Sequence, residues 1–459
     1  MAFHDNFVPG YFGAKLAGMG IAFSALVAFG QAVAPTDLGT PAPIVAITGG
    51  KLLTISHGVI ENGTVVLSGG KIAAVGAAST VSIPSGAQIV DAKGMTVYPG
   101  LIDSETNLGL SEIEADEASN DLVETSEEIF PNMHVSDAFH AETERIPVDR
   151  INGITNAIVA PASDDTLPGQ DIFIQLAGRD RDQMILAKDV ALAMNFSGEQ
   201  RRRGKDRKFP STRMGLATQL RQTFIDAQAY AASKSEYQAK LEKWQKGEKK
   251  DYAPTPPKMD LKSEALLPYL RGERPVVLGA YESYEIEVAM QIAQEFHLKV
   301  VLNHVTHGQE ILDKIAAYKV PVIVGPIYDF PSANERYDSV YTLPAELYKR
   351  GVKIAFSSAG SANSGSPGGF ERNLPYAAGY AVAYGLPYDE ALKAITLNPA
   401  EIWGVADKLG SLDVGKTANI VIANGDPLDV RTDVKQIYIE GHAIPMQSRQ
   451  TKLRDEYSK

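Results

Sequence analysis

Two histidines and one glutamate are the residues of this sequence best suited to metal chemistry. His304 and His307 lie in the run VVLNHVTHG, and Glu105 follows the run TVYPGLID. One glutamate and two histidines form a catalytic zinc set in which a fourth position is left for water. A metal site at Glu105, His304 and His307 is therefore one interpretation. The simpler interpretation is a capping or surface histidine at His307 and a hydrogen-bonded carboxylate at Glu105.

Other residues offer weaker signals for chemistry. Ser357, Ser358 and Ser361 follow an apolar run, but no histidine–aspartate arrangement accompanies them, and serine-rich loops are common without catalysis. His134 and His140 are six residues apart, which is not the spacing of metal ligands on a helix. The sequence has no cysteine, which excludes disulfides, thiolate ligands and a cysteine nucleophile.

Eight short apolar runs supply the elements that would position these residues. Amphipathic stretches such as 283–296 and 308–318 alternate with several of them, which is typical of a parallel sheet covered on both faces. Eight such runs predict a (β/α)₈ TIM barrel. Because two of the runs are close in sequence, one of that pair is also compatible with a hairpin outside the barrel. The runs are 96–103, 154–160, 171–177, 190–196, 274–280, 298–304, 320–326 and 352–358, and the close pair is 171–177 and 190–196.

The two segments that flank the central region have a different sequence pattern. Short alternating strands broken by glycine occur near each end, with hairpin signals at Asn62-Gly63 and Gly69-Gly70. We expect residues 43–97 and 409–447 to form one composite β-sandwich beside a barrel at 98–408. A polar, helical insertion at about 199–262, which includes the basic run 201–205, is best interpreted as a solvated excursion.

The N-terminus and the charge bear on location and partners. Residues 1–34 contain an uncharged apolar run that ends in small residues, which predicts a secretory signal peptide or, if it is not cleaved, a membrane anchor. The expected location is therefore periplasmic or secreted. The net charge of −12 is spread along 459 residues, so nucleic acid is not an expected partner.

Three motifs resemble the amidohydrolase superfamily, in particular the relatives of imidazolonepropionase. They are PGLID at 99–103, EALKAITLNPAEIWGV at 390–405, and LGSLDVGKTANIVIANGDPL at 409–428, where Asn419 replaces the usual aspartate. The resemblance implies a barrel that carries one or two divalent metals at its mouth and hydrolyses non-peptide C–N bonds in amides and cyclic amides. In such enzymes the metal makes hydroxide available at neutral pH, and an aspartate that ends strand eight moves the proton.

The resemblance also assigns the metal positions, and most of them carry other residues here. The two histidines after strand one correspond to Glu105 and Asn107, and the strand-five histidine corresponds to Gly279. His304 matches the strand-six histidine, whereas the strand-eight aspartate corresponds to Ala359. Strand four offers Asn195 and no lysine or glutamate. We therefore expect no binuclear metal centre of the usual form.

Three interpretations of the site follow. The first is a catalytically altered or inactive paralogue that binds a small molecule at the barrel mouth, or a partner, as a homo-oligomer or paired with an active relative. The second is an active hydrolase with a rebuilt mononuclear site at Glu105, His304 and His307, holding a divalent metal such as zinc. The third is a metal-independent hydrolase or lyase that uses the serines.

Overall fold

The computed structural model describes residues 37–113, 116–197, 209–248, 252–328, 336–358 and 371–458. All of these residues lie within one compact unit, Val33–Lys459. The predicted signal segment 1–34, Ala359, Ser361 and the basic run 201–205 lie outside the described residues.

Strands from both ends of the described chain share one eight-stranded sheet. Its order is β18-β17-β16-β5-β1-β2-β3, and β4 pairs in parallel with β1. Apolar side chains such as Ile47, Val65 and Ile420 form its buried core. The strands are β1 (Val45–Leu53), β2 (Val59–Ser68), β3 (Lys71–Ala77), β4 (Gln88–Asp91), β5 (Thr96–Pro99), β16 (Ile420–Ala423), β17 (Val434–Ile439) and β18 (His442–Ile444).

One of the two hairpin predictions is confirmed and the other is wrong. Gly69 and Gly70 join β2 to β3 with φ of 57° and 75°, a backbone conformation that favours glycine. Asn62-Gly63 instead lies inside β2, where Gly63 pairs with Gly50 of β1. A Cβ atom on Gly63 would lie 2.3 Å from the Leu52 side chain, so this glycine makes room for core packing rather than for a turn.

The central region forms a ring of strands. Parallel pairing joins β11, β12, β13, β14 and β15 in that order, and also joins β6 to β7. The end of β15 meets β6, where the Ser358 backbone N–H donates to Asp103 Oδ1 at 3.2 Å. The strands are β6 (Leu101–Thr106), β7 (Ile154–Val159), β11 (Leu192–Asn195), β12 (Val276–Glu282), β13 (Val300–His307), β14 (Val322–Val324) and β15 (Ile354–Phe356).

The third position of the ring differs from an all-parallel barrel. Its strand is divided into β8 (Gly169–Gln170), which pairs antiparallel with β11, and β9 (Ile172–Gln175), which pairs antiparallel with β7. Only residues 160–168 connect β7 to β8, and a parallel crossover needs about a dozen residues or more. The chain therefore returns antiparallel. It then makes a hairpin with β10 (Ile185–Ala187), so the hairpin involves the run at 171–177.

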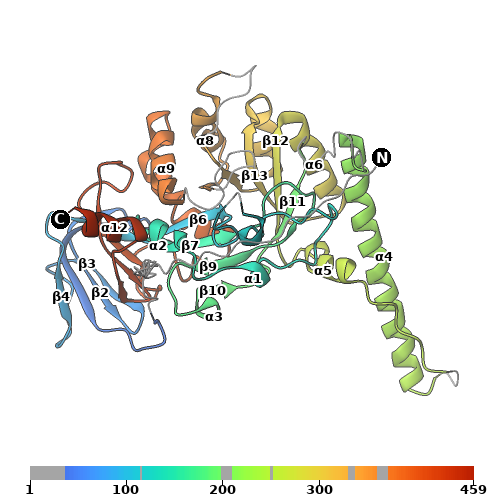
Figure 1. Ribbon diagram of the computed structural model, residues 1–459, viewed down its shortest axis with the longest axis horizontal. Coiled ribbons are helices and arrows are strands. Elements are labelled where there is room, and N and C mark those ends of the chain that lie inside the picture. Colours follow the sequence, from blue (N-terminus) through green and yellow to red (C-terminus); the bar gives the residue numbers. More distant parts are fainter. Residues whose placement is uncertain are drawn as a thin grey trace, which may run out of the picture. The chain divides into compact units, whose positions relative to one another are not determined.

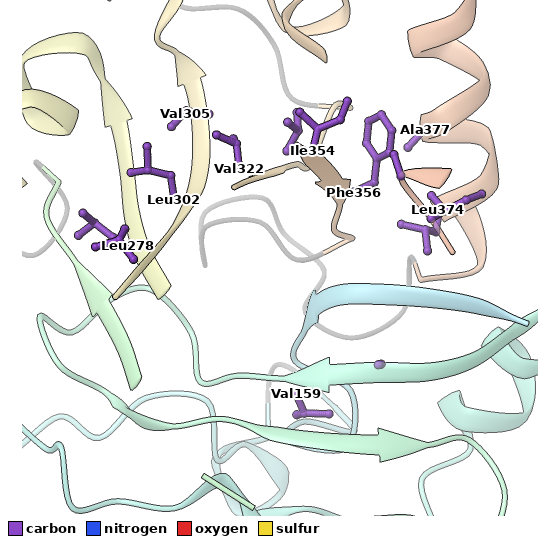
Figure 2. Close-up of a cluster of buried hydrophobic side chains, with 14 of the residues drawn as sticks. Val159, Leu278, Leu302, Val305, Val322, Ile354, Phe356, Leu374 and Ala377 are labelled. Carbon is purple, nitrogen blue, oxygen red and sulfur yellow. The ribbon is translucent and has the colours of Figure 1, made fainter. Parts of the chain in front are cut away.

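Helices surround the ring and bury its outer apolar residues. Figure 2 shows Val159 of β7 with side chains from β12 to β15 and with Leu374 and Ala377 of α9 (Leu374–Ala383) in the largest buried cluster of the described residues. The other α-helices outside the polar insertion are α1 (Val135–Ala138), α2 (Arg145–Arg150), α3 (Arg181–Met184), α6 (Ser283–Glu295), α7 (Leu312–Tyr318), α8 (Ser339–Lys349), α10 (Tyr388–Lys393), α11 (Leu397–Ile402) and α12 (Arg449–Tyr457). The mixed α/β barrel fold with an additional sheet agrees with the sequence prediction.

The described part of the polar insertion is helical. Its long helix α4 (Arg213–Gln245) has the partner helix α5 (Leu261–Leu270) packed beside it (Figure 1). Buried residues of α4 fall between Leu216 and Ala227, so its second half has no buried side chain. Among the described residues, no helix combines the length and apolar character needed to cross a membrane.

Candidate functional site at the barrel mouth

The end of β6 brings polar side chains into the barrel. Asp103 and Glu105 lie in β6, and Asn107 directly follows its last residue. All three are buried. The Asn107 amide donates to the carbonyl oxygen of Ala160 at 2.8 Å, which ties this side chain to the end of the neighbouring strand.

His304 on β13 is held in one orientation. Its Nδ1 lies 3.0 Å from the carbonyl oxygen of Gly325, and its ring stacks on that of Tyr281 at a centroid distance of 4.6 Å. A carbonyl oxygen only accepts, so Nδ1 carries the proton and Nε2 is left as an acceptor. Such an imidazole is suited to bind a cation or to accept a proton.

Asn303 stands between Glu105 and His304. Its Nδ2 donates to Glu105 Oε2 and lies 3.4 Å from His304 Nε2. The backbone N–H of His304 donates to Asn303 Oδ1 at 2.8 Å, which fixes which end of the amide faces the two acceptors. The partly positive end of a neutral amide therefore faces both the carboxylate and the imidazole.

The space beside Gly279 is also filled. A Cβ atom on Gly279 would lie 2.4 Å from Asn195 Oδ1, while the Asn195 amide donates to the carbonyl oxygen of Asp165 at 2.9 Å. The side chain at the strand-four position thus occupies the room where a side chain at the strand-five position would begin.

The structure brings two of the three proposed metal residues together. Glu105 and His304 both contact Asn303, whereas His307 Nδ1 lies 3.2 Å from Glu282 Oε1. Among the described residues, no group of three histidine, aspartate or glutamate side chains could hold a metal ion.

Ser357 is buried, and its Oγ has no hydrogen-bond partner among the described residues, whereas His134, His140 and Ser358 have ordinary partners. His134 lies 2.6 Å from Asp189, and His140 lies 3.7 Å from Asp121. Ser358, which precedes Ala359 in the sequence, donates through Oγ to Asp103. These contacts account for both histidines and for Ser358 without catalysis.

Several carboxyl groups near Glu105 and Asp103 are buried, and sequence reasoning missed Asp149 and Glu371 among them. Glu371 accepts a hydrogen bond from Thr106, and its charge adds to the burial that raises the pKa of Asp149 well above its usual range. Burial likewise raises the pKa of Asp103 well above its usual value. Burial also raises the pKa of Glu105, although His304 and the Asn303 hydrogen bond partly offset this effect.

Asp171 is the most unusual of these groups. It lies at the break between β8 and β9, its side chain is 1% exposed, and neither carboxyl oxygen has a hydrogen-bond partner in the described part of the chain. Its neighbour Gln170 accepts a hydrogen bond from Tyr269 of α5, and Asp171 itself interacts electrostatically with both Tyr269 and Glu105. Burial and the charge of Glu105 raise the pKa of Asp171 well above its usual range.

Comparisons with known proteins agree with the sequence motifs and with the fold. The family described as Amidohydrolase family matches residues 273–444. The crystal structure of an amidohydrolase from Thermotoga maritima is 28% identical, has a TM-score of 0.77, and aligns over 88% of this chain and all of that one. The chain belongs to the amidohydrolase superfamily. The sequence prediction of this superfamily is therefore confirmed.

Two proteins with similar sequences are also members or relatives of hydrolase and deaminase families by name, and each matches this chain over part of its own length. Amidohydrolase tasK of Hapsidospora irregularis is 26% identical over 377 residues, which cover 79% of this chain but only 37% of tasK. A 5-methylthioadenosine/S-adenosylhomocysteine deaminase of Thermoanaerobacter pseudethanolicus is 29% identical over 138 residues, or 28% of this chain and 30% of the deaminase. The chain thus spans about a third of the length of these two relatives.

Proposed function

We propose that this amidohydrolase-superfamily chain is a catalytically altered protein that binds a small molecule at the barrel mouth without the metal centre of its active relatives. The observation that carries this proposal is the position of Asn303. Its amide nitrogen faces Glu105 and His304, the two proposed metal ligands that the structure brings together. A donor in this place satisfies both acceptors in the way that a bound cation otherwise would.

The other donors fit the usual metal centre poorly. Asn107 offers a neutral amide that is already engaged with Ala160, and amides are weak ligands for zinc. Gly279 has no side chain, and Asn195 fills the adjacent space. The proposal therefore includes no metal-dependent step.

Glu105, Asn195 and His304 would instead serve as binding groups. They present a carboxyl group, an amide and an imidazole within a buried, polar barrel interior, where a ligand would exchange hydrogen bonds with them. Partner binding, as a homo-oligomer or with an active relative, is compatible with this role.

A second candidate function is a hydrolase with a rebuilt mononuclear site. The observation in its favour is that Glu105 and the acceptor nitrogen of His304 face the same amide, so a cation that displaced Asn303 would meet both. His307 would have to leave Glu282 to complete the set. Hydrolysis of an amide or cyclic-amide C–N bond would be the expected reaction, by analogy with the superfamily.

Removal of metal separates the two candidates. We expect dialysis against EDTA, and then addition of zinc, to leave the Tm of the chain unchanged, because no site binds the ion. A metal at 100 times its Kd would add about 2.7 kcal/mol to the free energy of unfolding. Differential scanning fluorimetry measures the shift, with Glu105→Ala as the control variant. A zinc-dependent rise in Tm that disappears in this variant would contradict the first candidate and support the second.

A further inference from the structure

An open groove lies away from the barrel mouth, between α9 and the loop that follows β16. Its volume is about 480 Å³, within the usual range for small-molecule sites. Tyr376 and Tyr380 line it from α9, Tyr388 from the start of α10, and Asp426 and Asp429 from the loop. Two helices that pack around the barrel and the loop between β16 and β17 of the eight-stranded sheet thus line one surface site.

The walls of this groove are held in place by contacts within the protein. Tyr388 Oη donates to Asp426 Oδ1 at 2.8 Å, and the backbone N–H of Leu428 donates to the same oxygen at 2.9 Å. A Cβ atom on Gly379 would lie 2.7 Å from the carbonyl oxygen of Leu428, so α9 meets the loop directly. A ligand would therefore meet a site that is largely formed in advance, which lowers the entropic cost of binding.

The groove combines negative charge with aromatic surface. Asp426 and Asp429 line it, and no lysine, arginine or histidine of the described chain does. Arg431 pairs with Asp429 at 2.5 Å, whereas Asp426 has no basic partner among the described residues. Burial and the hydrogen bond to Asp426 raise the pKa of Tyr388, so this hydroxyl stays protonated and keeps donating.

Tyr380 supplies an accessible ring. It is 48% exposed, although Tyr341 stacks on it at a centroid distance of 5.7 Å and Tyr328 meets it edge-on at 5.9 Å. The face of a tyrosine ring is negative, and it attracts ammonium and methylammonium groups. Carboxylate and aromatic ring therefore favour the same kind of ligand.

We propose that this groove binds a small organic cation, with its ammonium group beside Asp426 and its methyl or methylene groups against Tyr376 and Tyr380. Charge complementarity selects this occupant over a neutral or anionic one. The negative charge of Asp426 and the negative faces of the tyrosine rings both attract the cationic group. The apolar part of the ligand then packs against the aromatic surface.

Binding of choline to the full chain tests this proposal. The neutral carbon analogue 3,3-dimethyl-1-butanol has nearly the same shape, so it isolates the effect of charge. Isothermal titration calorimetry or ligand-observed NMR should show saturable choline binding that is at least about tenfold tighter than binding of the neutral analogue. Asp426→Asn keeps an acceptor for Tyr388 and should weaken choline binding by about tenfold or more.

Two further variants complete the test. Asp433→Asn removes a nearby carboxylate that pairs with Lys435 outside the groove, and it should leave choline binding unchanged. Tyr380→Leu should weaken it, because the ring is lost while apolar bulk remains. Circular dichroism checks that each variant is folded. Equal affinity for choline and its neutral analogue, full binding by Asp426→Asn, or no saturable binding of choline by the folded chain would overturn the proposal.

Discussion

Replacing Asn303 with aspartate is expected to lower the free energy of unfolding of the metal-free chain by about 3–5 kcal/mol. The amide that donates to Glu105 would become a second carboxylate facing the first, within a buried site. Zinc should recover much of this loss, because Glu105, His304 and the new carboxylate would then surround one cation. Urea unfolding with EDTA and with zinc measures both effects.

A matched variant separates this effect from a general loss of a hydrogen bond. The side-chain amide of Asn398 also donates a hydrogen bond, to the carbonyl oxygen of Ile354 at 2.9 Å. Asn398 lies in α11 and is not one of the residues that contact Glu105 and His304. Asn398→Asp should destabilise the chain without any recovery in zinc. If Asn303→Asp is as stable as the wild type without metal, the Asn303 amide does not satisfy Glu105 and His304 as inferred. If zinc stabilises both variants equally, the recovery is not specific to the mouth.

Replacing Asp171 with asparagine is expected to stabilise the chain by about 1–3 kcal/mol at pH 8, because a neutral amide replaces a buried carboxyl group whose charged form is disfavoured by burial and by the charge of Glu105. Asparagine has nearly the same shape, so the packing of the strand break should persist. Most conservative core substitutions destabilise a protein, which makes a gain of this size diagnostic.

The same variant should change the dependence of stability on pH. The folded-state pKa of Asp171 is raised above its unfolded value of about 3.9. The folded chain therefore binds this proton more tightly than the unfolded chain, so the contribution of Asp171 to stability is greatest below about pH 4 and falls as the pH rises toward the raised pKa. Asp171→Asn should remove part of this decline.

Other titratable groups near Asp171 also contribute to the pH dependence of stability. Glu105 on β6 and Tyr269 on α5 interact electrostatically with it, and Glu105 itself has a raised pKa, so some decline should remain in the variant. Asp455→Asn, on the exposed face of α12, should leave the profile of the wild type unchanged. Urea unfolding from about pH 4, near the pKa of an aspartate in the unfolded chain, to about pH 8 gives the comparison. If the free energy of unfolding falls equally with pH in Asp171→Asn and in the wild type, the raised pKa of Asp171 does not contribute to the decline.

The fold could be predicted from the sequence because its signals are local. Apolar runs such as 274–280 and 298–304 became β12 and β13, and the amphipathic stretch 283–296 became α6. The direction of the third strand could not be predicted in the same way, since an apolar run has the same pattern in both directions. Only the short connection 160–168 indicated an antiparallel return, and its length becomes clear once the ends of β7 and β8 are known.

The site was predictable only where a motif fixed the position. Glu105 and His304 were found because they stand at defined places in the superfamily pattern, and the structure places them on either side of Asn303. Asn303, Asp171 and Glu371 match no motif. Their significance depends on burial and on partners far away in sequence, such as Thr106 for Glu371, which periodicity and spacing do not contain.

The proposed loss of the metal centre depends most directly on whether the purified full chain holds zinc. Reconstitution with excess zinc, removal of free metal by gel filtration and elemental analysis give the number of ions per chain, with His304→Ala measured alongside. We expect wild type and variant both to retain far less than one zinc per chain. One zinc per wild-type chain that is lost in His304→Ala would contradict the proposed loss, and would identify the barrel mouth as a rebuilt metal centre instead.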